Sequence, residues 1–167
     1  MKPITATKKG LLTGIVMVLV SIGIFYVKGN FQNSLQYITY AVYIAGIVWT
    51  LLEHSKSPEA KHTFADYFSQ GFKCFIVVTL LMVIFTAAFL FLQPGLKEQM
   101  AETYRADLLK TGNYTLPEIE EKIKTARKSF IPALVMGAVF GYLVIGAMVT
   151  VTTAIVFIQK RKLRMGT

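Results

Sequence analysis

Four long stretches of this sequence carry no charged side chain and no histidine, and they constrain its fold more than any other feature. They are residues 11–27, 34–52, 74–92 and 130–158. A helix that crosses the hydrocarbon core of a bilayer needs about 20 mainly apolar residues, with a usual range of about 17–25. Helices of a soluble bundle would instead show polar residues at a helical repeat, and these stretches lack that pattern. The sequence therefore predicts an all-α membrane protein.

The predicted architecture is a single polytopic domain over residues 1–167 with four transmembrane helices. The expected helices cover residues 11–27, 34–52, 72–93 and 130–158. Ion-coupled transporters and pumps place ionisable side chains inside the membrane. The uncharged stretches hold none, so the sequence favours a structural or interaction role over transport.

Lysines and arginines are distributed unequally between the two ends of the predicted helices. With a cytoplasmic N-terminus, the cytoplasmic segments hold ten basic and three acidic residues, whereas the short outer turn holds a single basic residue, Lys28. Because basic residues of short loops stay on the cytoplasmic side, both termini are predicted to be cytoplasmic. Contact with anionic membrane lipids explains the basic tail, residues 159–167. No nucleic-acid partner is expected.

The connection between the third and fourth predicted helices is the longest part of the chain outside the bilayer. Residues 95–110 place apolar side chains on one helical stripe, and Thr115 with Glu118 fits a capping box that starts a second helix. Pro132 is expected to kink this second helix rather than end it. We expect a helical hairpin over residues 95–128 on the outer, periplasmic side. It fits a solvated spacer, a partner-docking element or a substrate lid.

The stretch HTFADYFSQGFK, residues 62–73, precedes the third apolar run and is rich in aromatic rings. Thr63 followed by Asp66 is a helix-start signature, and Gly71 offers a bend. Four aromatic residues are expected to share one face of a short helix lying in the membrane interface. These residues are Phe64, Tyr67, Phe68 and Phe72. The stretch is therefore predicted to be an interfacial elbow helix before the third span.

No recognisable constellation of residues points to catalysis. The two histidines, His54 and His62, are eight residues apart, and a zinc site usually needs three or four ligands. The sequence predicts no catalytic residue, no metal site and no cofactor, and hence a protein that is not an enzyme. An enzyme would require Glu53, Asp66 and His62 to converge in a polar cleft.

Small residues at a spacing of four mark one face of the fourth predicted helix. Ala133, Gly137 and Gly141 form this series. Small residues at this spacing let two helix backbones approach closely, and packing drives helix association in lipid. The series fits packing inside the bundle. It also fits a seam with a second copy of the chain or with another inner-membrane protein.

Three tyrosines recur every three residues in the second predicted helix. They are Tyr37, Tyr40 and Tyr43. They fit an aromatic belt at the membrane surface together with core packing. They also fit the lining of a cleft for a lipid or small hydrophobic ligand.

Three features together resemble a family of bacterial membrane proteins found mainly in Bacteroidota, the domain of unknown function 4199 family. They are Gly10 and Gly14 in the first helix, the elbow TFADYFSQGFK, and a long outer helical loop that returns through a glycine-rich helix into a basic tail. The resemblance covers residues 5–162 and implies a four-helix inner-membrane protein. It supplies no activity and no catalytic residues.

The function favoured by these observations is that of a non-enzymatic scaffold or accessory subunit of the bacterial inner membrane. It would bind a second copy or another membrane protein through the fourth helix and the outer hairpin. The alternative is a binder or carrier of a lipid or small hydrophobic ligand.

Overall fold

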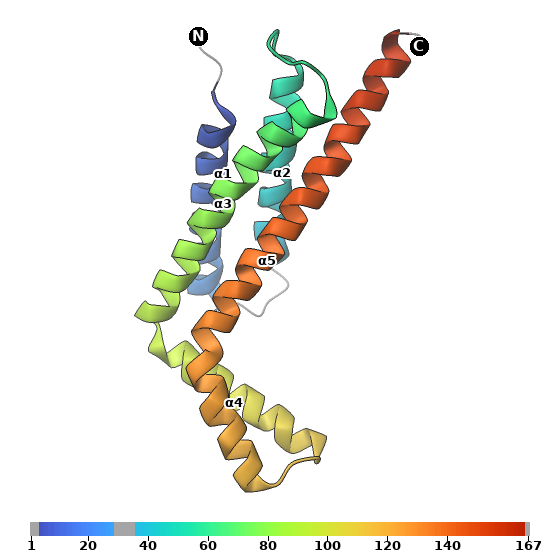
Figure 1. Ribbon diagram of the computed structural model, residues 1–167. Coiled ribbons are helices and arrows are strands. Elements are labelled where there is room, and N and C mark those ends of the chain that lie inside the picture. Colours follow the sequence, from blue (N-terminus) through green and yellow to red (C-terminus); the bar gives the residue numbers. More distant parts are fainter. Residues whose placement is uncertain (1–3, 29–35, 166–167) are drawn as a thin grey trace. The chain divides into compact units, whose positions relative to one another are not determined.

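All regular secondary structure is helical in the part of the chain that the structure describes, residues 4–28 and 36–165 (Figure 1). The computed structural model contains helices α1 (Ala6–Lys28), α2 (Gln36–Ser55), α3 (Phe64–Leu92), α4 (Pro94–Thr111) and α5 (Leu116–Met165). The predicted all-α class is confirmed. The chain divides into two compact units, Met1–Met82 with Val139–Thr167 as unit 1 and Val83–Ala138 as unit 2.

Three of the described helices are long and apolar enough to cross a membrane. The apolar segments are Ala6–Val27, Phe64–Leu92 and Leu116–Leu163. The membrane character is supported. Within the described residues three spans are found rather than the four predicted, because α2 is not among these helices. The predicted span 34–52 was recognised by its lack of charge. Its first two residues, 34 and 35, lie outside the described part of the chain, and the described helix ends in the polar residues Glu53, His54 and Ser55.

In unit 1, α1 packs closely against both of its neighbours at glycines. A Cβ built on Gly10 of α1 would lie 2.6 Å from the backbone carbonyl oxygen of Cys74 in α3. A Cβ on Gly46 of α2 would collide with the side chain of Thr13 in α1. Because neither glycine has a side chain, the helix backbones approach each other directly, as small residues permit in membrane helices.

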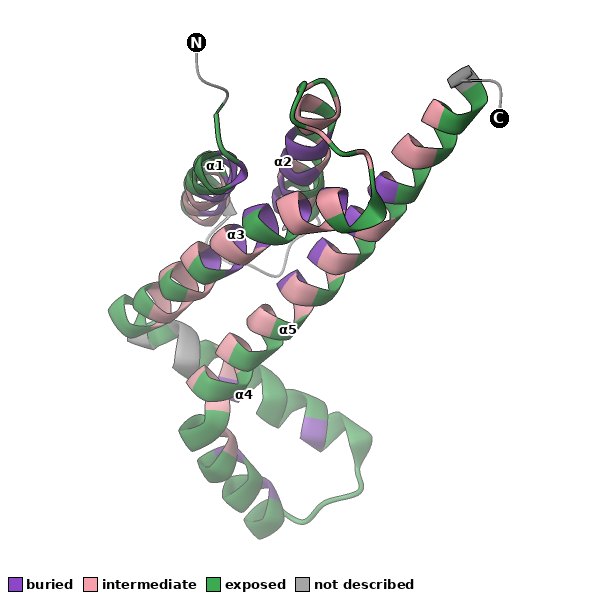
Figure 2. Cartoon of the chain, turned by 45° about the horizontal axis from the view of Figure 1, so that its top comes forward, coloured by how far each residue is buried: buried purple, intermediate pink, exposed green. Residues whose placement is uncertain are grey.

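The part of α5 in unit 1 packs on α2 and α3 in the same way. A Cβ on Gly146 of α5 would meet the hydroxyl group of Tyr43 in α2 and the ring of Phe75 in α3. The Tyr43 hydroxyl donates a hydrogen bond of 2.8 Å to the backbone carbonyl of Tyr142 in α5. Figure 2 shows the buried positions of α2, α3 and α5 turned toward one another. These contacts define the core of unit 1.

α3 begins at Phe64 and is helical without interruption to Leu92. The prediction of a separate elbow helix before the third span is therefore wrong. Gly71, which was expected to provide a bend, is buried inside α3, where a Cβ would collide with Thr150 of α5. The glycine serves close packing of two helices rather than a change of direction.

Unit 2 contains the end of α3, all of α4 and the part of α5 up to Ala138. Within it, α4 and α5 pack through a small apolar cluster. Its buried residues are Ala101, Leu108, Ile119 and Ile123. Gly112, directly after α4, has a φ of 67°, the left-handed conformation that commonly ends a helix. The Thr115 backbone N–H donates a 2.8 Å hydrogen bond to the Glu118 carboxylate, which is the bond of a capping box.

Two ion pairs join α4 to α5 within unit 2. Arg127 lies 2.7 Å from Glu98, and Arg105 pairs with Glu120. α5 then remains helical through Pro132, so the expectation that this proline would not end the helix is confirmed. Because these ion pairs are half-exposed, they add little stability individually, and the apolar cluster dominates the packing.

Gly10→Ala is expected to destabilise the packing of α1 on α3. The added methyl group would collide with the backbone of Cys74, which cannot rotate away as a side chain can. Overpacking of this kind costs about 1–3 kcal/mol. Thermal unfolding of the full chain in detergent should show a lower midpoint for this variant.

Gly23→Ala is the matched control, because a Cβ at Gly23 of α1 would have no described atom within 4 Å. We expect the midpoint of this control to equal or exceed that of the unsubstituted chain, since alanine favours the helix. Equal midpoints for the two alanine variants would contradict the packing described for Gly10.

Candidate functional site

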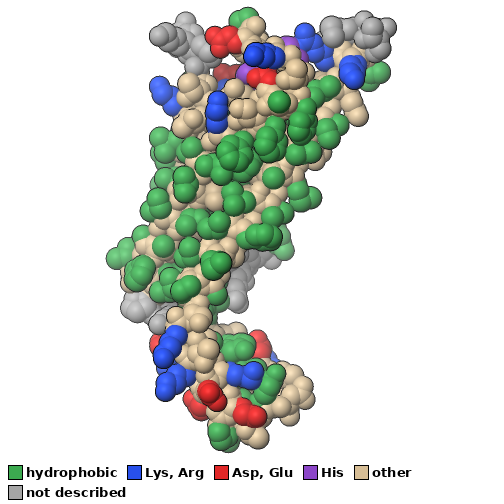
Figure 3. Space-filling model, in the orientation of Figure 1, with side chains coloured by type: hydrophobic (Ala, Val, Ile, Leu, Met, Phe, Trp, Pro, Cys, Tyr) green, Lys and Arg blue, Asp and Glu red, His purple; other side chains and the backbone are tan. Residues whose placement is uncertain are grey.

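The start of α1, the end of α2, the start of α3 and the end of α5 meet at one end of unit 1. We call this end, formed by residues 9, 53–67 and 157–162, the polar end. Lys9 of α1 lies 2.5 Å from Glu53 of α2, and His54 of α2 lies 2.9 Å from Asp66 of α3. Figure 3 shows charged side chains gathered here, with hydrophobic side chains covering the adjacent helices.

Lys9 is a buried cation with a dedicated counter-charge. It is 4% exposed, and its ammonium group also lies 5.7 Å from the centre of the Trp49 ring. A buried charge is tolerated when it is paired, and an aromatic face adds a favourable interaction. Lys9 therefore joins α1 to α2 and is not a free surface charge.

Asp66 organises the loop between α2 and α3. Its Oδ2 accepts a hydrogen bond of 2.9 Å from the backbone N–H of Lys61, and the same atom lies 2.9 Å from His54 Nε2. The Asp66 backbone N–H donates in turn to the Thr63 hydroxyl at 3.3 Å, the helix-start contact that the sequence indicated. One carboxylate thus fixes the loop to two helices.

His62 occupies a strained backbone position beside α3. Its φ is 56°, a left-handed conformation that is uncommon for residues other than glycine. Its Nδ1 lies 2.9 Å from the hydroxyl oxygen of Tyr67, a side chain that is 2% exposed. Strained residues persist where their surroundings hold them, and they cluster at functional sites.

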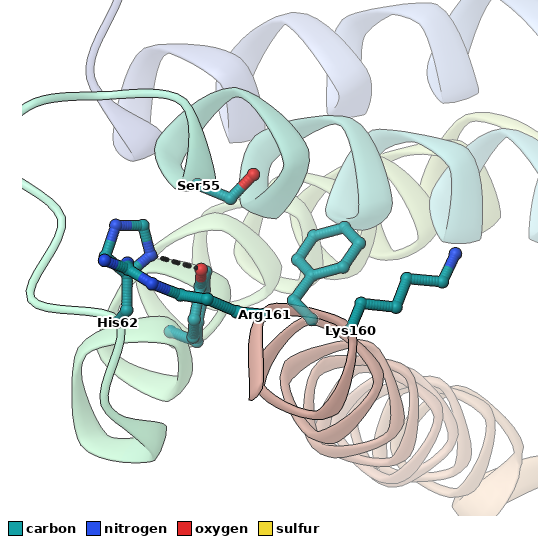
Figure 4. Close-up of a pocket in the computed structure, with 6 residues that line it drawn as sticks. Ser55, His62, Lys160 and Arg161 are labelled. Atoms are coloured by element: carbon teal, nitrogen blue, oxygen red, sulfur yellow. Dashed lines mark hydrogen bonds between the residues drawn. The ribbon is translucent and has the colours of Figure 1, made fainter. Parts of the chain in front are cut away.

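An open pocket of about 400 Å³ lies at the polar end (Figure 4). Its lining comes from the end of α2, the following loop, α3 and the last turns of α5. The lining residues are Ser55, His62, Tyr67, Phe157, Lys160 and Arg161. The ring of Phe157 contacts that of Tyr67 at a centroid distance of 6.0 Å and forms an apolar wall. The pocket therefore combines an apolar wall with two basic side chains.

The three residues that an enzyme would need to bring together each have a different partner. Glu53 pairs with Lys9, Asp66 with His54, and His62 with Tyr67. No group of three or more His, Cys, Asp or Glu side chains is placed to hold a metal ion within the described residues.

The aromatic residues predicted to share one face of the elbow separate into two groups. Phe64, Phe68 and Phe72 stack along α3 with centroid distances of 5.9 and 6.2 Å, and Phe64 and Phe72 are each 45% exposed. Tyr67 instead points into unit 1, where it contacts His62 and Phe157. The three phenylalanines form a surface ladder, whereas Tyr67 belongs to the pocket.

The tyrosines of α2 are also divided. Tyr43 is fully buried, and both Tyr43 and Tyr40 contact the ring of Tyr142, at 5.5 and 5.9 Å. Tyr37 is 75% exposed. The structure thus brings two of the three together, around Tyr142.

The small residues predicted as a helix-packing seam line up along α5. A Cβ on Gly137 or on Gly141 would have no described atom within 4 Å. Met136 and Phe140, beside them, are each 71% exposed. Unlike Gly146 further along the same helix, these two glycines are not used for packing within the described chain.

Sequence reasoning missed the pocket. It treated Lys160 and Arg161 as a tail that anchors the last helix in the lipid headgroups. Their only signal is that they come shortly after the apolar run ending at Ile158, with Gln159 between. Nothing in the spacing of the sequence indicates that they return to the loop holding His62.

A protein-family model described as "Protein of unknown function (DUF4199)" matches residues 8–159. No curated protein and no solved structure matches the chain. The matched region includes the whole loop from Glu53 to Tyr67 and ends one residue before Lys160.

Asp66→Ala is expected to loosen the loop between α2 and α3. The substitution removes the acceptor for the Lys61 N–H and the partner of His54. A hydrogen bond to a charged group contributes about 1.5–3 kcal/mol, so this amide should exchange its hydrogen at least about tenfold faster. Hydrogen–deuterium exchange with mass spectrometry of the peptide covering this loop measures the change.

Glu59→Ala is the control, because it removes the same charge from the same loop and the Glu59 side chain has no partner among the described residues. It should leave the exchange rate unchanged. A rate in Asp66→Ala equal to that of this control would show that Asp66 does not hold the loop.

Proposed function

The chain belongs to the family of proteins of unknown function DUF4199, and we propose that it is a non-enzymatic scaffold or accessory subunit of a membrane. The partner is a second copy of the chain or another inner-membrane protein. The helices that are apolar enough to span a membrane support the location. The partners that the polar residues already have support a structural role for the polar end.

The observation that carries this proposal is the contrast between two sets of glycines. Gly10, Gly46, Gly71 and Gly146 are filled by neighbouring helices of the same unit. Gly137 and Gly141 have the spacing suited to close helix packing, but open space surrounds them. A helix that keeps such a seam beside exposed Met and Phe side chains is suited to pack against a helix of another chain.

The hairpin of unit 2 offers a second contact surface. Large apolar side chains are exposed on it outside the internal cluster. They are Tyr104, Leu109, Tyr114 and Leu116, at 42%, 50%, 41% and 65% exposure. Large exposed apolar side chains of this kind contribute to interaction surfaces. This surface would bind the part of a partner that projects from the bilayer.

The location proposed is the bacterial inner membrane, with both termini cytoplasmic and the hairpin periplasmic. The pairing of Lys9 with Glu53 and the contact of Tyr67 with Phe157 support termini on one side, because they join both ends of the chain within unit 1. The basic residues at this end support the cytoplasmic side.

Gly137→Leu and Gly141→Leu are expected to weaken self-association of the full chain in liposomes at least about tenfold. Leucine at either position fills the open seam and keeps two helices apart, while the fold of the chain should tolerate it because no described neighbour is displaced. Energy transfer between copies labelled with donor and acceptor dyes measures association.

Gly23→Leu is the matched control, because it adds the same bulk at an open glycine of α1 that lacks small residues four positions away. It should associate as the unsubstituted chain does. Native mass spectrometry of the chain extracted from its own membranes extends the test to other partners. A complex that survives both α5 substitutions would refute the proposed seam.

A further inference from the structure

We propose that the pocket at the polar end binds a phosphate group, carried by a membrane lipid headgroup or by a free phosphate. The residues concerned are Arg161, Lys160, His62 and Tyr67. They lie apart from the seam of α5, so this inference goes beyond the scaffold function and stands or falls separately.

The strongest observation in support of a phosphate site concerns Arg161. Its Nη1 atom is buried and has no hydrogen-bond partner among the described residues. A buried donor without a partner costs free energy, more so when it is charged. Figure 4 shows the Arg161 side chain extending toward His62, whereas Lys160 extends to the other side. Arg161 lines the pocket, and a guanidinium group matches the oxygens of a phosphate group, which it can bind through two parallel hydrogen bonds.

The charge balance of the pocket favours an anion. Lys160 and Arg161 line it, and no ion pair joins either to an acid among the described residues. Asp66 is the acid beside Tyr67 in the sequence, but its Oδ2 is already shared by His54 and the Lys61 N–H. One oxygen of this carboxylate is thus engaged within the loop, and neither Lys160 nor Arg161 has an acidic partner among the described residues.

His62 and Tyr67 are arranged to complete the site. His62 Nδ1 and the Tyr67 hydroxyl are 2.9 Å apart, and the left-handed backbone of His62 holds the ring at this position. Ser55 donates its hydroxyl proton to the Leu52 carbonyl at 2.7 Å, so it is not a donor to the ligand. The donors available to a phosphate group therefore come from Arg161 and the His62–Tyr67 pair, and Lys160 adds a second positive charge to the lining.

The position of the pocket suits a ligand that is polar at one end and apolar at the other. Phe157 belongs to the apolar run of α5, and Lys160 follows three residues later. A volume of about 400 Å³ is within the usual range of ligand pockets, and a phosphate group alone would not fill it. The space beside Phe157 is suited to the glycerol and first acyl carbons of a phospholipid.

The test uses the full chain in detergent with three probes. They are dioctanoyl phosphatidylglycerol, inorganic phosphate and dioctanoylglycerol, which lacks the phosphate group. Binding is measured by native mass spectrometry and by the ligand-dependent rise in unfolding temperature. We expect saturable binding of phosphatidylglycerol to the unsubstituted chain and none of dioctanoylglycerol.

Arg161→Gln is expected to weaken phosphatidylglycerol binding at least about tenfold, because it removes a charged hydrogen bond to the phosphate group. Arg161→Lys keeps the charge but not the planar guanidinium group. Its affinity for phosphatidylglycerol should lie between those of the unsubstituted chain and Arg161→Gln. Lys162→Gln is the matched control. It removes one positive charge from the neighbouring, exposed position that does not line the pocket, and it should bind as the unsubstituted chain does.

The outcomes separate the two sources of the phosphate group. If inorganic phosphate competes with the lipid at a similar concentration, the pocket is a free-phosphate site. If inorganic phosphate does not compete, the pocket is a headgroup site. Equal binding by Arg161→Gln and Lys162→Gln would overturn the proposal, since only general surface charge would then matter. If Arg161→Gln fails to fold, Lys160→Gln takes its place, with the same weakening expected against the same control.

Discussion

Close approach of helix backbones at glycines is the constraint on which the rest of unit 1 depends. In lipid, apolar side chains gain little by meeting each other, so packing contacts must hold the helices together. The backbone of α3 contacts Gly10. The side chain of Thr13 contacts Gly46, and the side chain of Thr150 contacts Gly71. These approaches set the register of four helical segments, and the register decides which side chains meet at the polar end.

The polar end follows from that register. When α2 and α3 pack side by side, His54 reaches Asp66, and Asp66 can then hold the Lys61 N–H of the loop between them. With the loop fixed, His62 meets Tyr67 and one side of the pocket is complete. The last turns of α5 supply the other side, because Gly71 and Thr150 bring that helix against α3. A pocket built from four segments thus depends on contacts made one to three helical turns away.

The sequence predicted what depends on local pattern and missed what depends on packing. Uncharged runs gave the helices, and Thr115 with Glu118 marked the start of α5. The uncharged run 34–52 predicted a fourth span, whereas the described α2 begins at Gln36, ends in Glu53, His54 and Ser55, and is not among the helices long and apolar enough to cross a membrane. From the local sequence alone, Gly71 predicts a bend. Its close contact with Thr150 of α5 shows that it is a packing position. The pocket joins Ser55 and His62 to Arg161, and no spacing rule connects residues that are about 100 positions apart.

The two surfaces proposed to act lie at separate positions along α5. Gly141 and Arg161 are 20 residues apart on this helix, which corresponds to about 30 Å along its axis. The hydrocarbon core of a bilayer has about the same thickness. If the pocket lies at the headgroups of one leaflet, Gly141 therefore lies toward the other. A partner helix packed on the seam would leave the mouth of the pocket open, so protein contact and phosphate binding can coexist on one chain.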